Sequence, residues 1–328
     1  METRQLGKTG LSVGAIGMGC WQLGADWGDV SEDQAMATLH AAADAGVNFF
    51  DTADVYGDGR SERLVGRLLA ERPDAGLIVA TKCGRRAAQD PANYTPGALR
   101  AWAERSRQNL GIPTIPLTQL HCPPDGVYED DRVFDALDAM VGEGLIGAYG
   151  VSVQTVAQGL RAALRPGVAT LQVIFNALRL KPMEALFPNC EKRGVGVIVR
   201  VPLASGLLSG KYDERTAFPA NDHRSYNRHG EAFDVGETFS GVPFEAGVQA
   251  ARRLRKTVLP DGWTLAEMAL RWCADAPGVS TVIPGAKSPL QAVANAAVGK
   301  RGRLPEKAAN GIRDHYYREI AFYVHDRW

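Results

Sequence analysis

Four consecutive apolar segments of this 328-residue chain each end in a side chain that could take part in catalysis. Asp51, Lys82 and His121 end the first three, and Ser152 ends the fourth. Tyr56 lies in the loop that follows Asp51. Each residue taken singly has an ordinary structural explanation, such as a loop cap or a satisfied buried imidazole. Polar groups at the ends of apolar strands have little packing reason to be there, so four in succession indicate a shared site.

A phenol, an ammonium, a carboxylate and an imidazole together predict a general-acid system directed at a carbonyl group. A phenol has an ordinary pKa of about 10 and is a weak acid at neutral pH. The ammonium of Lys82 would lower the pKa of Tyr56, because a nearby positive charge stabilises the phenolate. Asp51 would hold that ammonium in place, and His121 would orient a substrate oxygen. These residues supply no hydride, so a cofactor is expected.

The segments that carry these residues alternate with segments of helical periodicity. The short runs are apolar throughout and rich in β-branched residues, which is typical of parallel strands covered on both faces. Between them, apolar positions recur every three or four residues. The expected strands are 47–52, 77–82, 117–122, 148–152, 171–176, 194–202 and 279–285, and the expected helices are 32–45, 61–70, 96–110, 130–143, 155–164, 182–193 and 265–276.

This alternation fits either an open doubly wound sheet or a closed α/β barrel. The seven strands, with a weak eighth at 298–304, favour a (β/α)8 TIM barrel with its active site at the C-terminal ends of the strands. An open sheet would begin with a phosphate-binding glycine turn, but Gly14, Gly17 and Gly19 have the reverse of that spacing. Residues 11–20 instead predict a hairpin that plugs one end of the barrel.

Residues 1–328 are expected to form a single domain, because α/β barrels of this length fold as one unit. Within it, 212–244 predicts a long loop insertion rich in glycine and proline, and such loops are commonly functional. Trp27, in the loop before the first barrel helix, is a candidate for the substrate pocket. The histidines expected to be exposed in polar segments are His223, His229, His315 and His325.

The overall composition excludes several classes of protein. The chain has 37 Lys and Arg residues against 37 Asp and Glu residues, and 45% of it is hydrophobic. This mixture excludes intrinsic disorder and lacks the basic surplus of a nucleic-acid-binding protein. No uncharged apolar run approaches the roughly 18 residues of a membrane helix. The five cysteines have neither metal-ligand nor disulfide spacing, so we expect free thiols, no metal site and a cytoplasmic location.

Several segments, taken in order, resemble the aldo-keto reductase superfamily. The resemblance extends from about residue 6 to residue 295, and GRSE at 59–62 is typical of its bacterial and potassium-channel β-subunit-like branch. The matching segments are NFFDTADVYG (48–57), ATKCG (80–84), QLHCPP (119–124), GVS (150–152), LQVIFN (171–176), PLASGLLSGK (202–211) and IPGAKSP (283–289).

The resemblance implies an NADP(H)-binding barrel and a role for each matching residue. Tyr56 would donate a proton to the carbonyl oxygen, tuned by Lys82 and Asp51. His121 would orient the carbonyl group. The positions that match the family's cofactor contacts are Ser152 and Gln172 for the carboxamide, Pro202, Leu203, Ser205, Gly206 and Lys211 for the pyrophosphate, Gly285, Lys287, Gln291 and Asn295 for the adenosine and its 2′-phosphate, and Trp21 beside the nicotinamide.

Three positions depart from the family pattern. Val153 replaces a polar residue next to the carboxamide serine, and Arg200 replaces the aromatic residue that commonly stacks on the nicotinamide. A guanidinium can stack on a ring, but its charge would alter the electronics of the cofactor. Gln291 stands where other branches carry a basic residue, although Lys287 could supply the charge. NADP(H) is therefore favoured, with NAD(H) as the alternative.

The leading interpretation is an oxidoreductase that acts on a small aldehyde, ketone or sugar carbonyl. The first alternative is a cofactor-binding regulatory or partner subunit with weak reductase activity, as in relatives that associate with channels. The second is an aldolase that forms a Schiff base through Lys82. The intact His121 argues against the partner subunit, and Asp51 argues against the aldolase because it keeps the lysine charged. The sequence predicts neither the individual substrate nor the oligomeric state.

Overall fold

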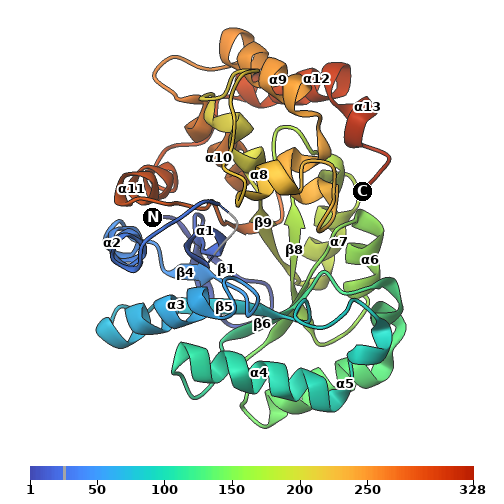
Figure 1. Cartoon of the computed structure of the whole chain (residues 1–328). Coiled ribbons are helices and arrows are strands. Elements are labelled where there is room, and N and C mark those ends of the chain that lie inside the picture. Colours follow the sequence, from blue (N-terminus) through green and yellow to red (C-terminus); the bar gives the residue numbers. More distant parts are fainter. Residues whose placement is uncertain (25–26) are drawn as a thin grey trace.

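The computed structural model describes residues 1–24 and 27–328 and shows eight parallel strands at the centre of a ring of helices (Figure 1). The strands are hydrogen-bonded to their neighbours in chain order. Backbone bonds from Gly17 N to Val282 O (2.8 Å) and from Gly19 N to Pro284 O (3.1 Å) join the first strand to the last. The predicted (β/α)8 barrel is confirmed. Its strands are β3 (Met18–Gly19), β4 (Phe49–Asp51), β5 (Ile78–Cys83), β6 (Leu117–His121), β7 (Tyr149–Ser152), β8 (Val168–Ile174), β9 (Gly196–Arg200) and β10 (Val279–Val282).

Several of the surrounding helices begin at residues whose side chains cap them. Ser31 caps α2 (Glu32–Asp44) through its side chain, and Thr155 and Gln158 form a capping box on α6 (Val156–Ala162). The other α-helices are α1 (Trp21–Gly24), α3 (Arg60–Glu71), α4 (Pro96–Leu110), α5 (Asp131–Gly142), α7 (Leu186–Arg193), α8 (His223–Tyr226), α9 (Phe244–Thr257), α10 (Leu265–Asp275), α11 (Pro289–Val298), α12 (Glu306–Glu319) and α13 (Ala321–Val324). The 3₁₀ helices are η1 (Pro91–Asn93), η2 (Asp125–Glu129), η3 (Lys181–Met183), η4 (Ala204–Ser209), η5 (Val235–Glu237) and η6 (Phe239–Gly241).

An antiparallel hairpin of β1 (Thr3–Gln5) and β2 (Ser12–Gly14) precedes the barrel. Leu6 and Val13 from this hairpin are fully buried and pack in one cluster with Phe49, which begins β4. The hairpin therefore covers the end of the barrel at which the strands begin. The predicted plug is confirmed, but its strands lie at 3–14 and not at 11–20, where the chain has already entered the barrel.

The expectation of a strand at 298–304 is wrong. Val298 is the last residue of α11, and the eighth strand is β3, at the start of the barrel. β3 has two residues, Met18 and Gly19, in a segment whose glycines resemble a turn, so no apolar run marks it. Those glycines allow close approach, since a Cβ on Gly17 would lie 2.9 Å from Phe49 O.

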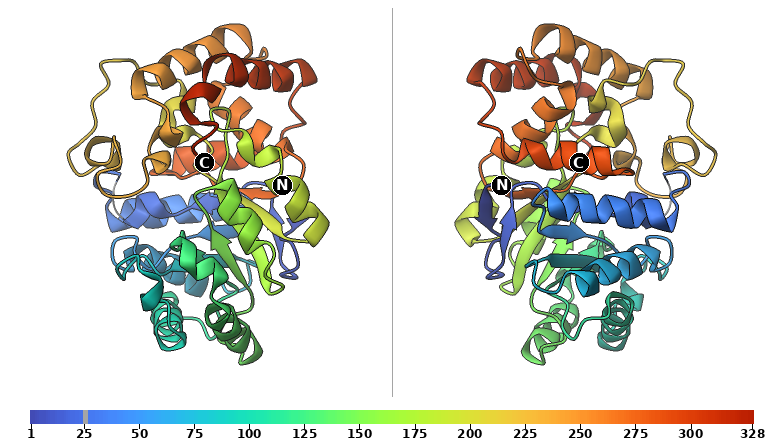
Figure 2. Two further views of the ribbon diagram at one scale, coloured as in Figure 1. Left: turned by 90° about the vertical axis from the view of Figure 1, so that its right-hand side faces the viewer. Right: turned by 90° about the vertical axis from the view of Figure 1, so that its left-hand side faces the viewer.

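The chain between Tyr212 and Phe244 contains α8, η5 and η6 and is otherwise irregular. This segment extends along one side of the barrel (yellow to orange in Figure 2) and reaches the pocket described below. Trp27 and Asp222 form an isolated antiparallel bridge, which ties the segment to the loop after β3. Within residues 1–24 and 27–328, no helix has the length and apolar character needed to cross a membrane.

Candidate active site

The catalytic candidates meet at the C-terminal ends of neighbouring strands. The parallel register pairs Lys82 with Gln119 and His121 with Ser152. Asp51 is the last residue of β4. Beyond it, residues 57–59 all have positive φ, and two of the three are glycine, which adopts this conformation without strain. The chain therefore reverses just after Tyr56 and holds the phenol over the barrel end.

Lys82 is the centre of a buried polar network at this end of the barrel. Its Nζ lies 2.5 Å from Asp51 Oδ1, 2.9 Å from Thr52 O and 3.3 Å from Tyr56 Oη. Gln172 and Gln119 donate to Asp51 Oδ2 at 2.8 and 3.1 Å. Asp51 and Lys82 are 2% and 1% exposed, so their charges depend on each other for stabilisation.

Burial and neighbouring charges set the protonation states of these groups. Burial alone would lower the pKa of Lys82, but Asp51 and Tyr56 together outweigh it and raise that pKa above its usual value. Burial raises the pKa of Tyr56, and it outweighs the expected opposing effect of the Lys82 ammonium. Burial, followed by the charges of Arg85, Lys82 and Arg200, holds the pKa of His121 well below its usual value. At neutral pH the site therefore contains an ammonium, a protonated phenol and a neutral imidazole.

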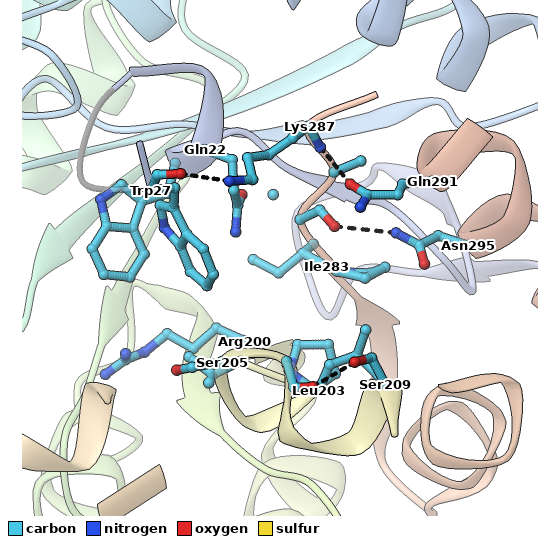
Figure 3. Close-up of a pocket in the computed structure, with 18 of the residues that line it drawn as sticks. Gln22, Trp27, Arg200, Leu203, Ser205, Ser209, Ile283, Lys287, Gln291 and Asn295 are labelled. Atoms are coloured by element: carbon cyan, nitrogen blue, oxygen red, sulfur yellow. Dashed lines mark hydrogen bonds between the residues drawn. The ribbon is translucent and has the colours of Figure 1, made fainter. Parts of the chain in front are cut away.

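A long pocket opens at this end of the barrel (Figure 3). In Figure 3, Arg200, Leu203 and Ser209 lie along one side of it, and Trp27 and Lys287 lie along the other. The predicted site residues that line the pocket are Trp21, Asp51, Tyr56, His121, Gln172, Arg200, Pro202, Leu203, Ser205, Gly206, Lys211, Gly285, Lys287, Gln291 and Asn295.

Lys82 and Ser152 do not belong to that lining. Lys82 lies beneath it and contacts Asp51 and Tyr56, which do line the pocket. Ser152 is fully buried, and its hydroxyl lies 3.5 Å from Cys122 Sγ. The structure therefore brings Lys82 to the reacting groups indirectly and leaves Ser152 away from the pocket surface.

The far part of the pocket has features that suit an anionic ligand. Val201, Ala204 and Ser205 have positive φ, a strained conformation for residues other than glycine that is commonly found at ligand sites. Turns of this kind point successive backbone N–H groups toward bound anions. Burial and the charge of Arg224 lower the pKa of Lys287, so a bound anion would relieve an existing repulsion.

Glu237 belongs to the site, although no sequence pattern pointed to it. It lies in η5 of the irregular segment and lines the pocket. Its carboxylate binds Arg85 at 2.5 and 3.2 Å and lies 3.7 Å from Arg200 Nη1. Although burial opposes it, these two cations lower the pKa of Glu237 to about 2. The residue is carried by a loop without periodicity, so only the folded chain reveals it. Other pocket residues that the sequence did not single out include Gln22, Tyr212 and Arg224.

Two of the four histidines expected to be exposed are buried. His223 is 0% exposed, and its ring centroid lies 4.8 Å from that of Trp21 and 4.5 Å from that of Trp27. His315 is 1% exposed on α12. The polar sequence around each residue concealed the apolar side that packs inward. Trp27 lines the pocket, as expected.

Asp54 is a buried carboxyl group close to the site and provides a test of the electrostatics. It is 1% exposed, and neither of its oxygens has a hydrogen-bond partner among the described residues. Burial and the charge of Glu62, opposed by Arg86 and Arg105, raise its pKa from 3.8 to about 7. The folded protein therefore binds the proton more tightly than the unfolded chain does, and the associated stability is lost as pH rises toward 7.

We expect Asp54→Asn to become increasingly favourable, relative to the unsubstituted protein, as pH rises. The difference in unfolding free energy should grow by up to roughly 4 kcal/mol between pH 4 and pH 8. Urea denaturation of both proteins at several pH values measures it. The exposed Asp74→Asn serves as the control and should show no such trend. A constant difference across pH would mean that Asp54 does not titrate in this range.

Comparison with known proteins agrees with this geometry. The model of the Aldo/keto reductase family matches residues 15–316. The chain is 27% identical to the uncharacterized oxidoreductase YqkF of Bacillus subtilis over 98% of both chains. It is 29% identical to a probable voltage-gated potassium channel subunit beta of Oryza sativa subsp. japonica over 90% of each. The structure of the glycerol dehydrogenase AKR11B4 from Gluconobacter oxydans has a TM-score of 0.79 at 29% identity, covering 97% of this chain and 96% of that one. The chain belongs to the aldo/keto reductase family, with bacterial and channel-subunit relatives.

Proposed function

We propose that this protein is an NADP(H)-dependent oxidoreductase that reduces an aldehyde, ketone or sugar carbonyl to the alcohol, or catalyses the reverse reaction. One observation carries the proposal. The hydroxyl of Tyr56 belongs to a half-buried side chain that lines the pocket, is protonated, lies 3.3 Å from the Lys82 ammonium, and shares its pocket with a neutral His121. A proton donor next to a fixed cation suits a reaction in which negative charge develops on a carbonyl oxygen.

The pocket residues fit a dinucleotide. The strained turn at 201–206 and the cations Lys211 and Lys287 would hold its phosphates, with Gln291 and Asn295 at the adenosine. Gln22 Oε1 is buried without a partner among the described residues, so this wall has a spare acceptor. Lys287 lines this part of the pocket, and burial and the charge of Arg224 lower its pKa, so a phosphate there would be favourable, and we favour NADP(H) over NAD(H) on this basis.

When bound, the nicotinamide supplies the hydride for the carbonyl carbon. Tyr56 Oη donates its proton to the carbonyl oxygen, and Lys82 Nζ stabilises the phenolate that remains. Asp51 keeps Lys82 charged and in place. His121, held neutral by its surroundings, donates an N–H to the same oxygen and orients it. In alcohol oxidation the Tyr56 phenolate accepts the proton instead.

The relatives favour the same class of reaction and leave one alternative. The Gluconobacter relative is named a glycerol dehydrogenase, which supports an alcohol and carbonyl pair as substrates. The rice relative is named as a channel subunit, which supports a cofactor-binding partner subunit as the second candidate. The complete set of Tyr56, Lys82, Asp51 and His121 favours the enzyme. We also propose that residues 1–328 form one domain. We further propose a cytoplasmic location, where the five free cysteines would stay reduced.

A panel of aldehydes, ketones and sugars tests the proposal by the loss of NADPH absorbance. We expect turnover with at least one class of carbonyl. Binding of the cofactor without turnover across a broad panel would overturn the enzymatic proposal and favour the partner subunit.

Lys287→Glu should weaken NADPH binding about 10- to 100-fold more than NADH binding. The variant would lose a charge-assisted contact with the 2′-phosphate, which NADH lacks, and its new carboxylate would repel that phosphate. Fluorescence titration with each cofactor measures both dissociation constants. Lys211→Glu is the matched control, because a contact with the pyrophosphate should affect the two cofactors alike. Equal losses for Lys287→Glu would refute the assignment.

A further inference from the structure

Arg200 places a fixed guanidinium in the pocket wall at the end of β9. The residue is 9% exposed. Its Nη2 donates to Gln154 Oε1 at 2.9 Å and to Val153 O at 3.3 Å, and its Nη1 lies 3.7 Å from Glu237 Oε2. Its Nε is buried and has no acceptor in the described part of the chain. The contacts at the two Nη atoms fix the guanidinium, and the residue forms part of the pocket lining.

In the described part of the chain, the charges around Arg200 do not cancel. Glu237 is shared, because Arg85 binds it with two hydrogen bonds while Arg200 lies beside it. Arg179 is a third cation, which donates to Gln154 O at 2.8 Å. Burial and the charge of Arg200 lower the pKa of Arg179 to about 9, so it remains charged at neutral pH. Asp234 is the second carboxylate here, and its charge partly offsets the lowering of the Arg179 pKa. Among the described residues, the three cations Arg85, Arg179 and Arg200 thus outnumber the two carboxylates Glu237 and Asp234, and this corner has a surplus of positive charge.

This positive corner adjoins the reacting groups. Arg200, His121 and Tyr56 line the same pocket, and Arg85 is bound to Glu237, which lines it too. The charges of Arg85 and Arg200 also contribute to the low pKa of His121. Trp21 stacks on Tyr56 with ring centroids 5.9 Å apart and occupies that side of the phenol. If the proposed function holds, a nicotinamide that serves a carbonyl at Tyr56 occupies the same end of the pocket, whose wall includes Arg200.

We propose that Arg200 makes this pocket select the reduced cofactor. The oxidised nicotinamide ring carries a positive charge and the reduced ring carries none, so a surplus of fixed cations repels the oxidised form alone. One uncompensated charge a few ångströms from the ring would favour NADPH over NADP⁺ by about 10- to 100-fold in affinity. When both forms are present, most of the protein then holds NADPH, and NADP⁺ dissociates readily. This distribution of bound cofactor favours carbonyl reduction. This inference rests on the proposed function but concerns binding and not turnover.

The ratio of the two dissociation constants tests it, measured by quenching of the pocket tryptophans and by calorimetry. We expect the ratio of Kd for NADP⁺ to Kd for NADPH to exceed about tenfold, to fall about tenfold in Arg200→Met, and to persist in Arg200→Lys. Glu237→Gln removes a negative charge from the same corner and should raise the ratio. Damage to the pocket would weaken both forms alike and would not shift the ratio in opposite directions.

The outcomes distinguish a failure of the proposed function from a failure of the inference about Arg200. A protein that binds neither form contradicts the proposed function. A protein that binds both forms equally, or a ratio that neither substitution moves, contradicts the inference and leaves the function standing. If Arg200→Met does not fold, the ratio in the unsubstituted protein and in Glu237→Gln still decides, because an equal or lowered ratio would overturn the inference. The exposed Arg132→Met is a control for the loss of a distant charge.

Discussion

Tyr56→Phe should lower kcat for carbonyl reduction by about a thousandfold and leave NADPH binding unchanged. The substitution removes one oxygen, which lies 3.3 Å from Lys82 Nζ, and keeps the ring that stacks on Trp21. The pocket therefore keeps its shape and loses its proton donor. Steady-state kinetics by NADPH absorbance and titration of protein fluorescence measure the two quantities separately.

Tyr128→Phe is the matched control for this experiment. Tyr128 is buried, at 2% exposed, and its hydroxyl has no partner among the described residues, but unlike Tyr56 it does not line the pocket. Its loss should leave kcat unchanged. Retention of activity in Tyr56→Phe would show that the proton comes from another group. If Tyr56→Phe abolished the reductase activity but left the effect of the protein in the cell unchanged, that result would favour a partner subunit over an enzyme.

Lys82→Met should cost about 3–5 kcal/mol of unfolding free energy, and kcat should fall at least about a hundredfold. Asp51 would keep its amide donors, Gln119 and Gln172, but lose the ammonium 2.5 Å away, so a buried negative charge would remain uncompensated. Tyr56 would also lose the cation that stabilises its phenolate. Urea denaturation and steady-state kinetics measure the two effects.

The double variant Asp51→Asn with Lys82→Met separates stability from chemistry. Removing both charges eliminates the uncompensated carboxylate, so part of the lost stability should return while kcat stays low. Arg67→Met, which breaks an exposed pair with Glu71, is the surface control and should cost no more than about 1 kcal/mol. If Lys82→Met were as mild as this control, the ion pair would not be the structural support that its burial indicates.

The sequence predicted the barrel and the catalytic group because both depend on local patterns. Apolar runs bounded by helical periodicity mark parallel strands, and the polar residue that ends each run marks the rim. Asp51, Lys82 and His121 each end such a run, and Tyr56 lies in the loop that follows the first of them. The structure brings all four together as expected, with Lys82 beneath the pocket wall and not in it.

The features that the sequence did not predict depend on contacts between distant parts of the chain. Glu237 lies in a loop without periodicity and meets Arg85 from another strand end only after folding. His223 lies in polar sequence and is buried by Trp21 and Trp27. Burial raises the pKa of Tyr56 and the Lys82 ammonium lowers it. The spacing of residues in the sequence does not indicate that burial has the larger effect.

The closure of the barrel has a consequence for when the protein is most rigid. β3 pairs with β4 at Met18 and Gly19 but meets the β10 side through isolated bridges, one of them between Gly19 and Gly285. Both glycines also line the pocket. Local opening of an element costs less free energy when fewer hydrogen bonds hold it. A ligand that contacts both β3 and the β10 side adds its binding free energy to the cost of separating them. A molecule that contacts Gly19 and Gly285 together would therefore hold β3 against the β10 side, and this join would be most rigid when the pocket is filled.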